Sequence, residues 1–269
     1  QELGIHGLND LASANPERLA VEMERFGEQH GDVARGLVAQ AVAQRDGLVE
    51  RLDSTFALPE LQGAPGVLLY DIESDPDARH DFLHGFLRLP RQSDGRWDLA
   101  AATYHPLLVM AEHGEQRSWL RLQRLLSRYD GWPILHYGET ETLSLRRLAQ
   151  RQGASDAQLR RLKRRLVDVH ARIRSHWRLP LSSYGLKSVA AWRGFRWSQA
   201  GVDGARALLW WRQWLGEGPK RRGSRHGLAW IFRYNQDDCR ATWAVAEWLL
   251  KEDDLLKTGP DTDQPTAGP

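Results

Sequence analysis

The chain has 269 residues, of which 41% are hydrophobic and 27% charged, and its formal net charge is +2. That length accommodates one large domain, or one domain with a small appendage. The longest apolar runs are far shorter than the roughly 20 residues that span a bilayer, so we expect a soluble protein with no membrane partner. The single cysteine, Cys239, excludes an intrachain disulfide and any site built from several cysteines. With no secretory signal pattern, the sequence favours a cytoplasmic location, with nucleoid association as one option.

Residues 1–57 predict a small helical module, because apolar residues recur at helical spacing from Leu3 to Leu52. Within it, residues 3–12 resemble the second half of a helix-hairpin-helix element, in which a glycine turn lets helix-terminal amides face a DNA phosphate. A plain helix-packing role fits the same residues equally well. Residues 58–65, with two prolines and a glycine, predict a linker.

Residues 66–252 predict an α/β domain. The almost wholly apolar run at 66–72 is typical of a buried central strand. Strand patterns at 82–89 and 97–104 flank a polar turn with Asp-Gly, which indicates a meander. A long helix at 107–129 leads to a short strand at 132–136, and a strand–helix–strand order implies a right-handed crossover.

From residue 141 onward the pattern is mostly helical. Residues 253–269 end in a run of Pro, Thr, Asp and Gly, and they predict a disordered tail. Between these limits we expect a short strand at 167–170 and helices at 186–192, 204–215 and 235–251.

Two acids, Asp71 and Glu73, end the apolar strand. Strand side chains alternate between faces, so the two carboxylates project to the same side. They would repel each other and lose hydration unless a cation lay between them, and Mg²⁺ or Mn²⁺ suits such oxygen ligands. Taken alone, the pair also fits a strand that ends in solvated, turn-forming acids.

Tyr234 and Asp238 lie four residues apart at the predicted start of an amphipathic helix. That spacing places both on one helix face, so the phenol and the carboxylate can address the same metal-bound water. The alternative is a capping cluster, in which Asn235, Asp237 and Asp238 complement the helix dipole.

A third acid follows the short strand at 132–136. A two-metal centre holds its ions about 4 Å apart around one phosphate and needs such a further ligand. We select Glu141, whose side chain opens the following helix, and Glu139 remains the alternative because the sequence leaves the loop geometry open. His136 is interpreted as a hydrogen-bonding residue at a strand end, and Asp168 as a helix cap or an outer ligand.

Basic residues are the candidates for contacts with nucleic-acid phosphates. For each cluster alone, a solvated helix face or loop is the alternative. Most of the 12 tryptophans lie at helical spacing among apolar residues, so core packing is their default role, although some could stack on unpaired bases. The selected phosphate-binding residues are Lys187, Arg164, Arg165, Lys220, Arg221 and Arg222.

The order Asp-x-Glu, His-Tyr-x-x-x-Glu, Tyr-x-x-x-Asp resembles the three exonuclease motifs of the DnaQ-like, DEDD superfamily in its tyrosine-bearing branch, DEDDy. More closely, the chain is similar to the YprB-type RNase H-like domain of RecB-like nuclease proteins, over about residues 66–250. Glu141 departs from the pattern, because the wider superfamily has Asp there. The residues that carry the resemblance are Asp71-Ile72-Glu73, Leu83-His84-Gly85-Phe86, His136-Tyr137, Val167-Asp168, Ser183-Tyr184-Gly185-Leu186-Lys187-Ser188, Gly194-Phe195-Arg196-Trp197 and the segment from Tyr234 to Thr242.

The resemblance implies an RNase H-like mixed five-stranded sheet flanked by helices, with two Mg²⁺ or Mn²⁺ ions held by Asp71, Glu73, Glu141 and Asp238. It implies 3′-to-5′ exonuclease action on single-stranded DNA or a duplex end, with Tyr234 orienting the attacking water. A helicase or a second nuclease domain is the expected protein partner. The alternatives are a catalytically weak nucleic-acid-binding module that assists such a partner, or a ribonuclease or endonuclease on the same scaffold.

Overall fold

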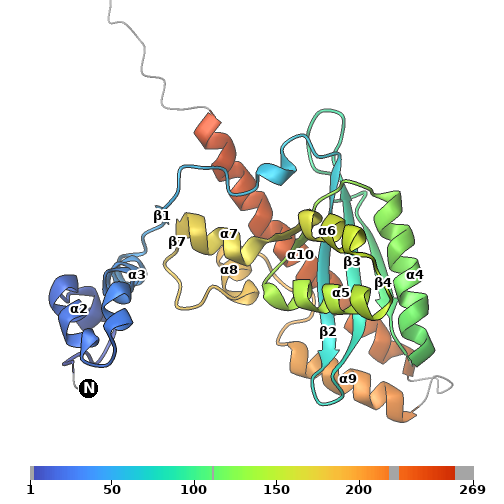
Figure 1. Ribbon diagram of the computed structural model, residues 1–269, viewed down its shortest axis with the longest axis horizontal. Coiled ribbons are helices and arrows are strands. Elements are labelled where there is room, and N and C mark those ends of the chain that lie inside the picture. The colour runs from blue at the N-terminus through green and yellow to red at the C-terminus, as the bar shows by residue number, and fades with distance from the viewer. Residues whose placement is uncertain (1–2, 111, 218–223, 258–269) are drawn as a thin grey trace, which may run out of the picture.

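The computed structural model describes residues 3–110, 112–217 and 224–257, and its centre is a five-stranded mixed sheet in the order β4-β3-β2-β5-β6 (Figure 1). β2, β3 and β4 are antiparallel neighbours, whereas β5 and β6 run parallel to β2. The predicted α/β class with a mixed five-stranded sheet is confirmed. The strands are β2 Gly66–Asp75, β3 His80–Pro90, β4 Thr103–Leu108, β5 Ile134–His136 and β6 Leu166–Asp168.

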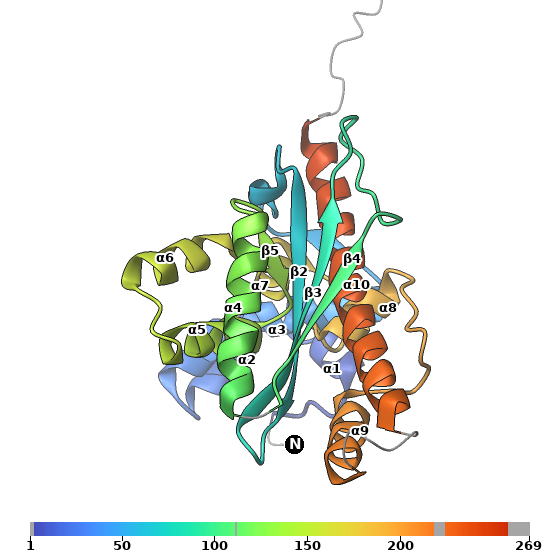
Figure 2. The same ribbon diagram turned by 90° about the vertical axis from the view of Figure 1, so that its right-hand side faces the viewer.

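Helices cover both faces of this sheet, and Figure 2 shows α4 and α10 on opposite sides of it. β2 is apolar on both faces because it packs into two cores: Leu69 joins the core under α10, while Leu68 and Tyr70 join the core under α4 and α5. One face carries α4 Glu112–Arg128, α5 Glu139–Arg151 and α6 Asp156–Arg165, and the other carries α7 Val169–His176, α8 Leu186–Trp192 and α10 Ser224–Lys257.

The helix α9 Gly204–Glu217 packs against the first turns of α10, near the carboxyl end of β2. Phe82 of β3 stacks on Trp211 of α9, with ring centroids 4.5 Å apart. The guanidinium of Arg212 donates to Asp75, the last residue of β2. The end of the strand that carries Asp71 and Glu73 is therefore held by both helices.

An N-terminal helical module is present and packs around Leu19, Ala34 and Val38. It is tied to the domain at two places. Gln40 donates to the carbonyls of Leu179 and Leu181, and β1 Glu50–Arg51 pairs with β7 Trp177–Arg178. The module comprises α1 Leu8–Ala12, α2 Pro16–Glu24, the 3-10 helix η1 Glu28–Val33 and α3 Ala34–Asp46.

Two predicted elements at the sheet edge are displaced. The strand expected at 97–104 is β4 at Thr103–Leu108, and Trp97 makes only an isolated bridge with Arg91. The helix expected from 107 begins at Glu112, because residues 103–108 pair with β3 instead. Pro106 is tolerated in β4 because this is an edge strand, where one missing amide donor leaves no sheet partner unpaired.

Three other boundaries were also wrong. The predicted linker at 58–65 is a packed segment, with the 3-10 helix η2 Pro59–Leu61 and with Leu58 and Leu61 buried in the core. The short strand expected at 167–170 ends at Asp168, where α7 takes over. The disordered tail predicted at 253–269 has the wrong start, because α10 continues to Lys257 and Asp253 is fully buried; the remainder of that segment, 258–269, lies outside the described residues. Among the described residues, no helix combines the length and the apolar character needed to cross a membrane.

Candidate metal centre

Asp71, Glu73 and Asp238 form a compact acidic cluster, in which one oxygen of each residue lies within 4.8 Å of the others. β2 supplies the first two and α10, which packs across β2, supplies the third. Alternation along the strand places Asp71 and Glu73 on one face, and Ile72 joins the core on the opposite face. The three acids that the sequence selected first are thus brought together.

The cluster is costly in the absence of a cation. Burial raises the pKa of Asp71 well above its usual value, and the charges of Asp238 and Glu73 raise it further. Burial and Asp238 likewise raise the pKa of Glu73. Burial raises the pKa of Asp238 to about 6, although hydrogen bonds from Trp197 and Tyr234 favour its charged form. These carboxylates therefore resist ionisation together unless a positive charge joins them.

Tyr234 and Asp238 lie within α10, which begins at Ser224. The alternative of a capping cluster is therefore wrong, because the helix N-terminus is far upstream of both residues. Burial and the nearby Asp238 raise the pKa of the Tyr234 hydroxyl, so it stays protonated at neutral pH and acts as a donor. The Lys187 ammonium lies 5.4 Å from the Tyr234 ring centroid and donates to the carbonyl of Val202 at 2.8 Å.

Glu141 is the acid of α5 that lies near this cluster. Burial raises its pKa to about 7, and the charges of Asp168 and Asp238 add to that rise. Its Oε2 is a buried atom that has no hydrogen-bond partner among the residues that the structure describes. It lies outside the three-acid group, yet its charge raises the pKa of both Asp71 and Glu73. Glu139, the alternative third acid, is exposed at the start of α5.

Two further polar residues hold the loop before α5. Asp168 caps α7 by accepting from the amides of His170 and Ala171, and it also accepts from the Gly138 amide at 3.0 Å. His136 is hydrogen-bonded through Nδ1 to the Gly138 carbonyl and through Nε2 to Thr142. The predicted cap and the predicted strand-end residue are confirmed, and together they fix the loop that leads to Glu141.

Sequence reasoning missed two side chains that touch the cluster. Asn235 donates through Nδ2 to Asp71 Oδ2 at 2.7 Å, and Trp197 donates through Nε1 to Asp238 Oδ1 at 2.6 Å. Both residues belong to the motifs quoted above, but Trp197 had no predicted role and Asn235 was named only in the alternative capping cluster. The next acid, Asp237, accepts from the amide and hydroxyl of Ser198 and so anchors the loop that carries Trp197.

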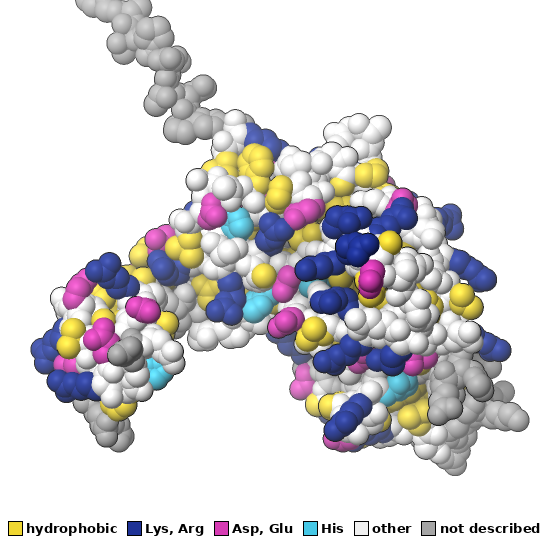
Figure 3. Space-filling model, viewed as in Figure 1, with side chains coloured by type: hydrophobic (Ala, Val, Ile, Leu, Met, Phe, Trp, Pro, Cys, Tyr) yellow, Lys and Arg dark blue, Asp and Glu magenta, His cyan; other side chains and the backbone are white. Residues whose placement is uncertain are grey.

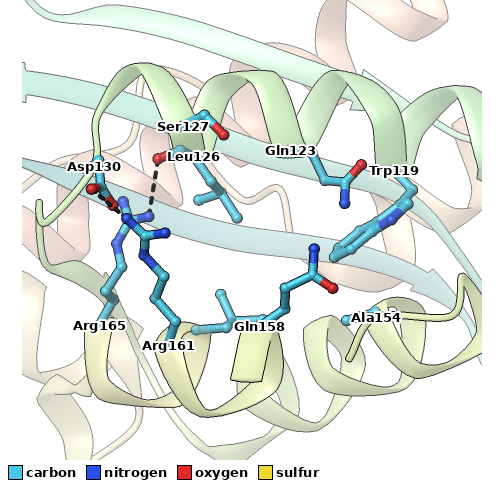
Figure 4. A pocket seen from close by; sticks show the side chains of 11 residues that line it. Trp119, Gln123, Leu126, Ser127, Asp130, Ala154, Gln158, Arg161 and Arg165 are labelled. Carbon is cyan, nitrogen blue, oxygen red and sulfur yellow. Dashed lines mark hydrogen bonds and ion pairs between the residues drawn. The ribbon is translucent and has the colours of Figure 1, made fainter. Parts of the chain in front are cut away.

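The basic residues divide into different roles. Arg165 is a structural residue, because its guanidinium donates to the carbonyls of Leu126, Tyr129 and Trp132 beside the hollow between α4 and α6 (Figure 4). Its selection as a phosphate ligand stays a prediction, and these contacts favour a structural role instead. Arg164, one residue earlier, is exposed. The other selected residues, Lys220, Arg221 and Arg222, lie outside the described residues.

Exposed cations gather over α5 and α6, where Figure 3 shows a group of Lys and Arg side chains. In this group Arg161 pairs with Asp130 and Arg151 pairs with Glu115, whereas four further exposed cations have no partner among the described residues. Such a surface attracts polyanions. Its exposed members are Arg147, Arg160, Lys163 and Arg164.

The donor set fits a hard divalent cation such as Mg²⁺ or Mn²⁺, because every candidate ligand atom is a carboxylate oxygen. Asp71, Glu73 and Asp238 would hold one ion. The unpartnered Oε2 of Glu141 is a buried acceptor that a second ion, or a water bound to it, would satisfy. The charge of Lys187 lowers the pKa of Glu73 and Asp238 without offsetting the rise caused by burial.

In a comparison with known protein families, the model of the RNase H superfamily matches residues 68–250. Searches of curated proteins and of solved structures gave no match. The matched segment contains all five strands of the sheet except the first two residues of β2, and it contains the whole acidic cluster.

Proposed function

Because the chain belongs to the RNase H superfamily, we propose that it is a divalent-metal-dependent nuclease that degrades DNA from the 3′ end by a two-metal mechanism. The observation that carries this proposal is the buried cluster of Asp71, Glu73 and Asp238. Three buried carboxylates with raised pKa values destabilise the fold when they are all ionised, and a bound cation would compensate for their burial and mutual repulsion.

Each side chain then has a definite task. Asp71, Glu73 and Asp238 would hold one ion, and Glu141 would be a ligand of the second ion or of a water bound to it. Bound divalent ions supply an activated water and neutralise charge on the leaving 3′ oxygen. The Tyr234 hydroxyl, which remains protonated and is hydrogen-bonded to Asp238, would help to orient that water and would not act as a base. Lys187, at the exposed rim of the centre, offers its charge to the phosphate backbone.

A cleavage assay tests the proposal. Single-stranded and duplex DNA and single-stranded RNA, each labelled at the 5′ end, are incubated with Mg²⁺ or Mn²⁺. We expect a ladder of shortening labelled DNA products with the wild type. Asp71→Asn and Glu141→Gln should each slow the reaction by at least about 100-fold, equivalent to about 2.7 kcal/mol of barrier. Glu139→Gln is the matched control and should stay within about twofold of wild type, since its side chain is exposed.

The other outcomes separate the alternatives. Binding of DNA without degradation under either metal would replace the enzyme with a nucleic-acid-binding module. Cleavage of a circular single strand would make the activity endonucleolytic, because an exonuclease has no end to start from. Faster degradation of RNA would assign a ribonuclease, and equal activity of Asp71→Asn would remove the proposed centre from the reaction.

A further inference from the structure

Asn235 is a fully buried polar side chain whose amide uses both of its ends. Its Nδ2 donates to Asp71 Oδ2 at 2.7 Å and to Glu73 Oε1 at 3.4 Å. Its Oδ1 accepts from the hydroxyl of Tyr104 on β4 at 2.8 Å. The two carboxylates fix the orientation of the amide, because a flipped amide would turn its oxygen toward two acceptors, and the Tyr104 hydroxyl donates to the amide oxygen in the orientation that they select.

The space for this amide comes from Gly85 on β3. A Cβ at this position would lie 1.6 Å from Asn235 Oδ1 and 2.9 Å from the Tyr104 hydroxyl oxygen. Gly85 is the register partner of Asp71 on one side and of Pro106 on the other. Its role is to leave a gap in the sheet surface, through which the α10 side chain reaches both β2 and β4.

We propose that Asn235 is a positioning residue of the metal centre, which holds Asp71 and Glu73 in the geometry that receives an ion. The inference rests on the proposed metal-dependent function. Each carboxylate keeps a second oxygen that Asn235 does not contact, and that oxygen remains available to an ion. A neutral amide suits this task because a Lys or Arg in its place would cancel the charge that attracts the cation. Outer hydrogen bonds of this kind orient metal ligands and tune their affinity.

The expected signature is a loss of metal affinity with little loss of turnover once metal is saturating. Asn235→Ala frees both carboxylates and should weaken Mn²⁺ binding by about 10- to 100-fold. Tyr104→Phe removes only the hydroxyl that donates to the amide oxygen and anchors it, and we expect a loss of about 3- to 10-fold, at the low end of the range for outer-shell partners. Gln236→Ala, on the next residue of α10, is the matched control and should bind Mn²⁺ like the wild type.

A double-mutant cycle tests the role of Gly85. In the wild type, Gly85→Ala should displace the amide and weaken Mn²⁺ binding about as much as Asn235→Ala does, by about 10-fold or more. In the Asn235→Ala background the same methyl group enters the space that the amide has left, so Gly85→Ala should cost nothing further. This strong non-additivity is the result expected of two residues that share one gap.

The experiment measures Mn²⁺ binding to the full chain by isothermal titration calorimetry, and cleavage at saturating Mn²⁺ in parallel. Thermal unfolding shows whether each variant is folded. Absence of Mn²⁺ binding in the wild type would count against the proposed function itself. If the wild type binds Mn²⁺ and loses it with Asp71→Asn, but Asn235→Ala binds as tightly as the wild type, the metal centre stands and the role of Asn235 is overturned. Additive losses in the cycle would overturn the role of Gly85.

Discussion

At the scale of single residues, β2 and β3 carry a buried polar pair, Tyr70 and His84, on the face of the sheet opposite the acidic cluster. The Tyr70 hydroxyl is 2.8 Å from His84 Nδ1. Asp81 nearby accepts hydrogen bonds from the hydroxyls of Ser74 and Ser144. Burial lowers the pKa of His84 to about 4, even though the charge of Asp81 opposes this change. His84 is therefore neutral in the folded protein at physiological pH.

This neutral histidine predicts a pH dependence of stability. The unfolded chain binds the His84 proton near pH 6.5, whereas the folded chain binds it only near pH 4. Between these values the unfolded state holds more protons, so stability falls as pH falls, by roughly 3 kcal/mol in total. We expect His84→Gln to lose stability at pH 7 and to recover relative to wild type at pH 4.5, in urea unfolding curves. His6→Gln, at an exposed position, should show no such trend. A constant difference for His84→Gln would contradict the prediction.

The sequence predicted the site residues that obey a simple period and missed those that depend on a tertiary contact. Asp71 and Glu73 follow from strand alternation, and Tyr234 with Asp238 from helix spacing. The contact of Asn235 with two strands was not predictable, because it depends on how α10 lies on the sheet and on a missing Cβ at position 85.

At the scale of elements, the presence of a helix or strand was easier to predict than the residues at which it begins and ends. The helix predicted to begin at Asn235 is α10, which begins eleven residues earlier, at Ser224. Its early turns bury Ile231 against Trp211 and Trp214 of α9. A helix that packs against another helix gains stability from that contact, which local periodicity does not reveal. β4 was displaced for the same reason, since its pairing with β3 decides where the strand lies.

Arg164 and Arg165 are neighbours on α6, but Arg164 is exposed whereas Arg165 contacts the backbone, so we expect their substitutions to have different effects. Arg165 donates to three backbone carbonyls at the end of α4, with distances of 2.8 to 3.1 Å. Arg165→Met removes all three hydrogen bonds, although the Tyr129 carbonyl still accepts from the Trp132 amide, and it should lower the free energy of unfolding by about 2 kcal/mol. Its affinity for DNA, measured by fluorescence anisotropy, should stay near wild type. Arg164→Ala should show the reverse: unchanged unfolding and weaker, less salt-dependent binding. Loss of DNA affinity in Arg165→Met, with unchanged stability, would restore Arg165 as a phosphate ligand.

At the scale of the whole molecule, the helical module and the last helix meet at one buried ion pair. The chain leaves the module through β1, passes over the end of α10 and enters the sheet (Figure 1). Arg51 of β1 donates to Asp253 of α10 at 3.0 Å. Asp253 also accepts from the backbone amides of Ala57 and Leu58, at 2.9 and 3.0 Å. The segment predicted as a linker is therefore attached to a residue predicted to be disordered. Both predictions were wrong because they used local composition, which does not reveal this tertiary contact.

Replacing this carboxylate should destabilise the whole chain. Asp253→Ala leaves two buried amides without an acceptor and removes the counter-charge of Arg51, whose guanidinium keeps only backbone carbonyls as acceptors. The Asp253 side chain is 0% exposed and that of Arg51 is 17% exposed. Loss of one partner of a buried pair costs about 3 to 5 kcal/mol, and we expect urea unfolding to show a decrease of that order. Asp254→Ala is the matched control. Asp254 is exposed and, within the described part of the chain, pairs only with Lys257 on the helix surface, so its loss should change the free energy of unfolding by less than about 0.5 kcal/mol. Similar unfolding curves for the two variants would mean that the connection between module and domain does not depend on Asp253.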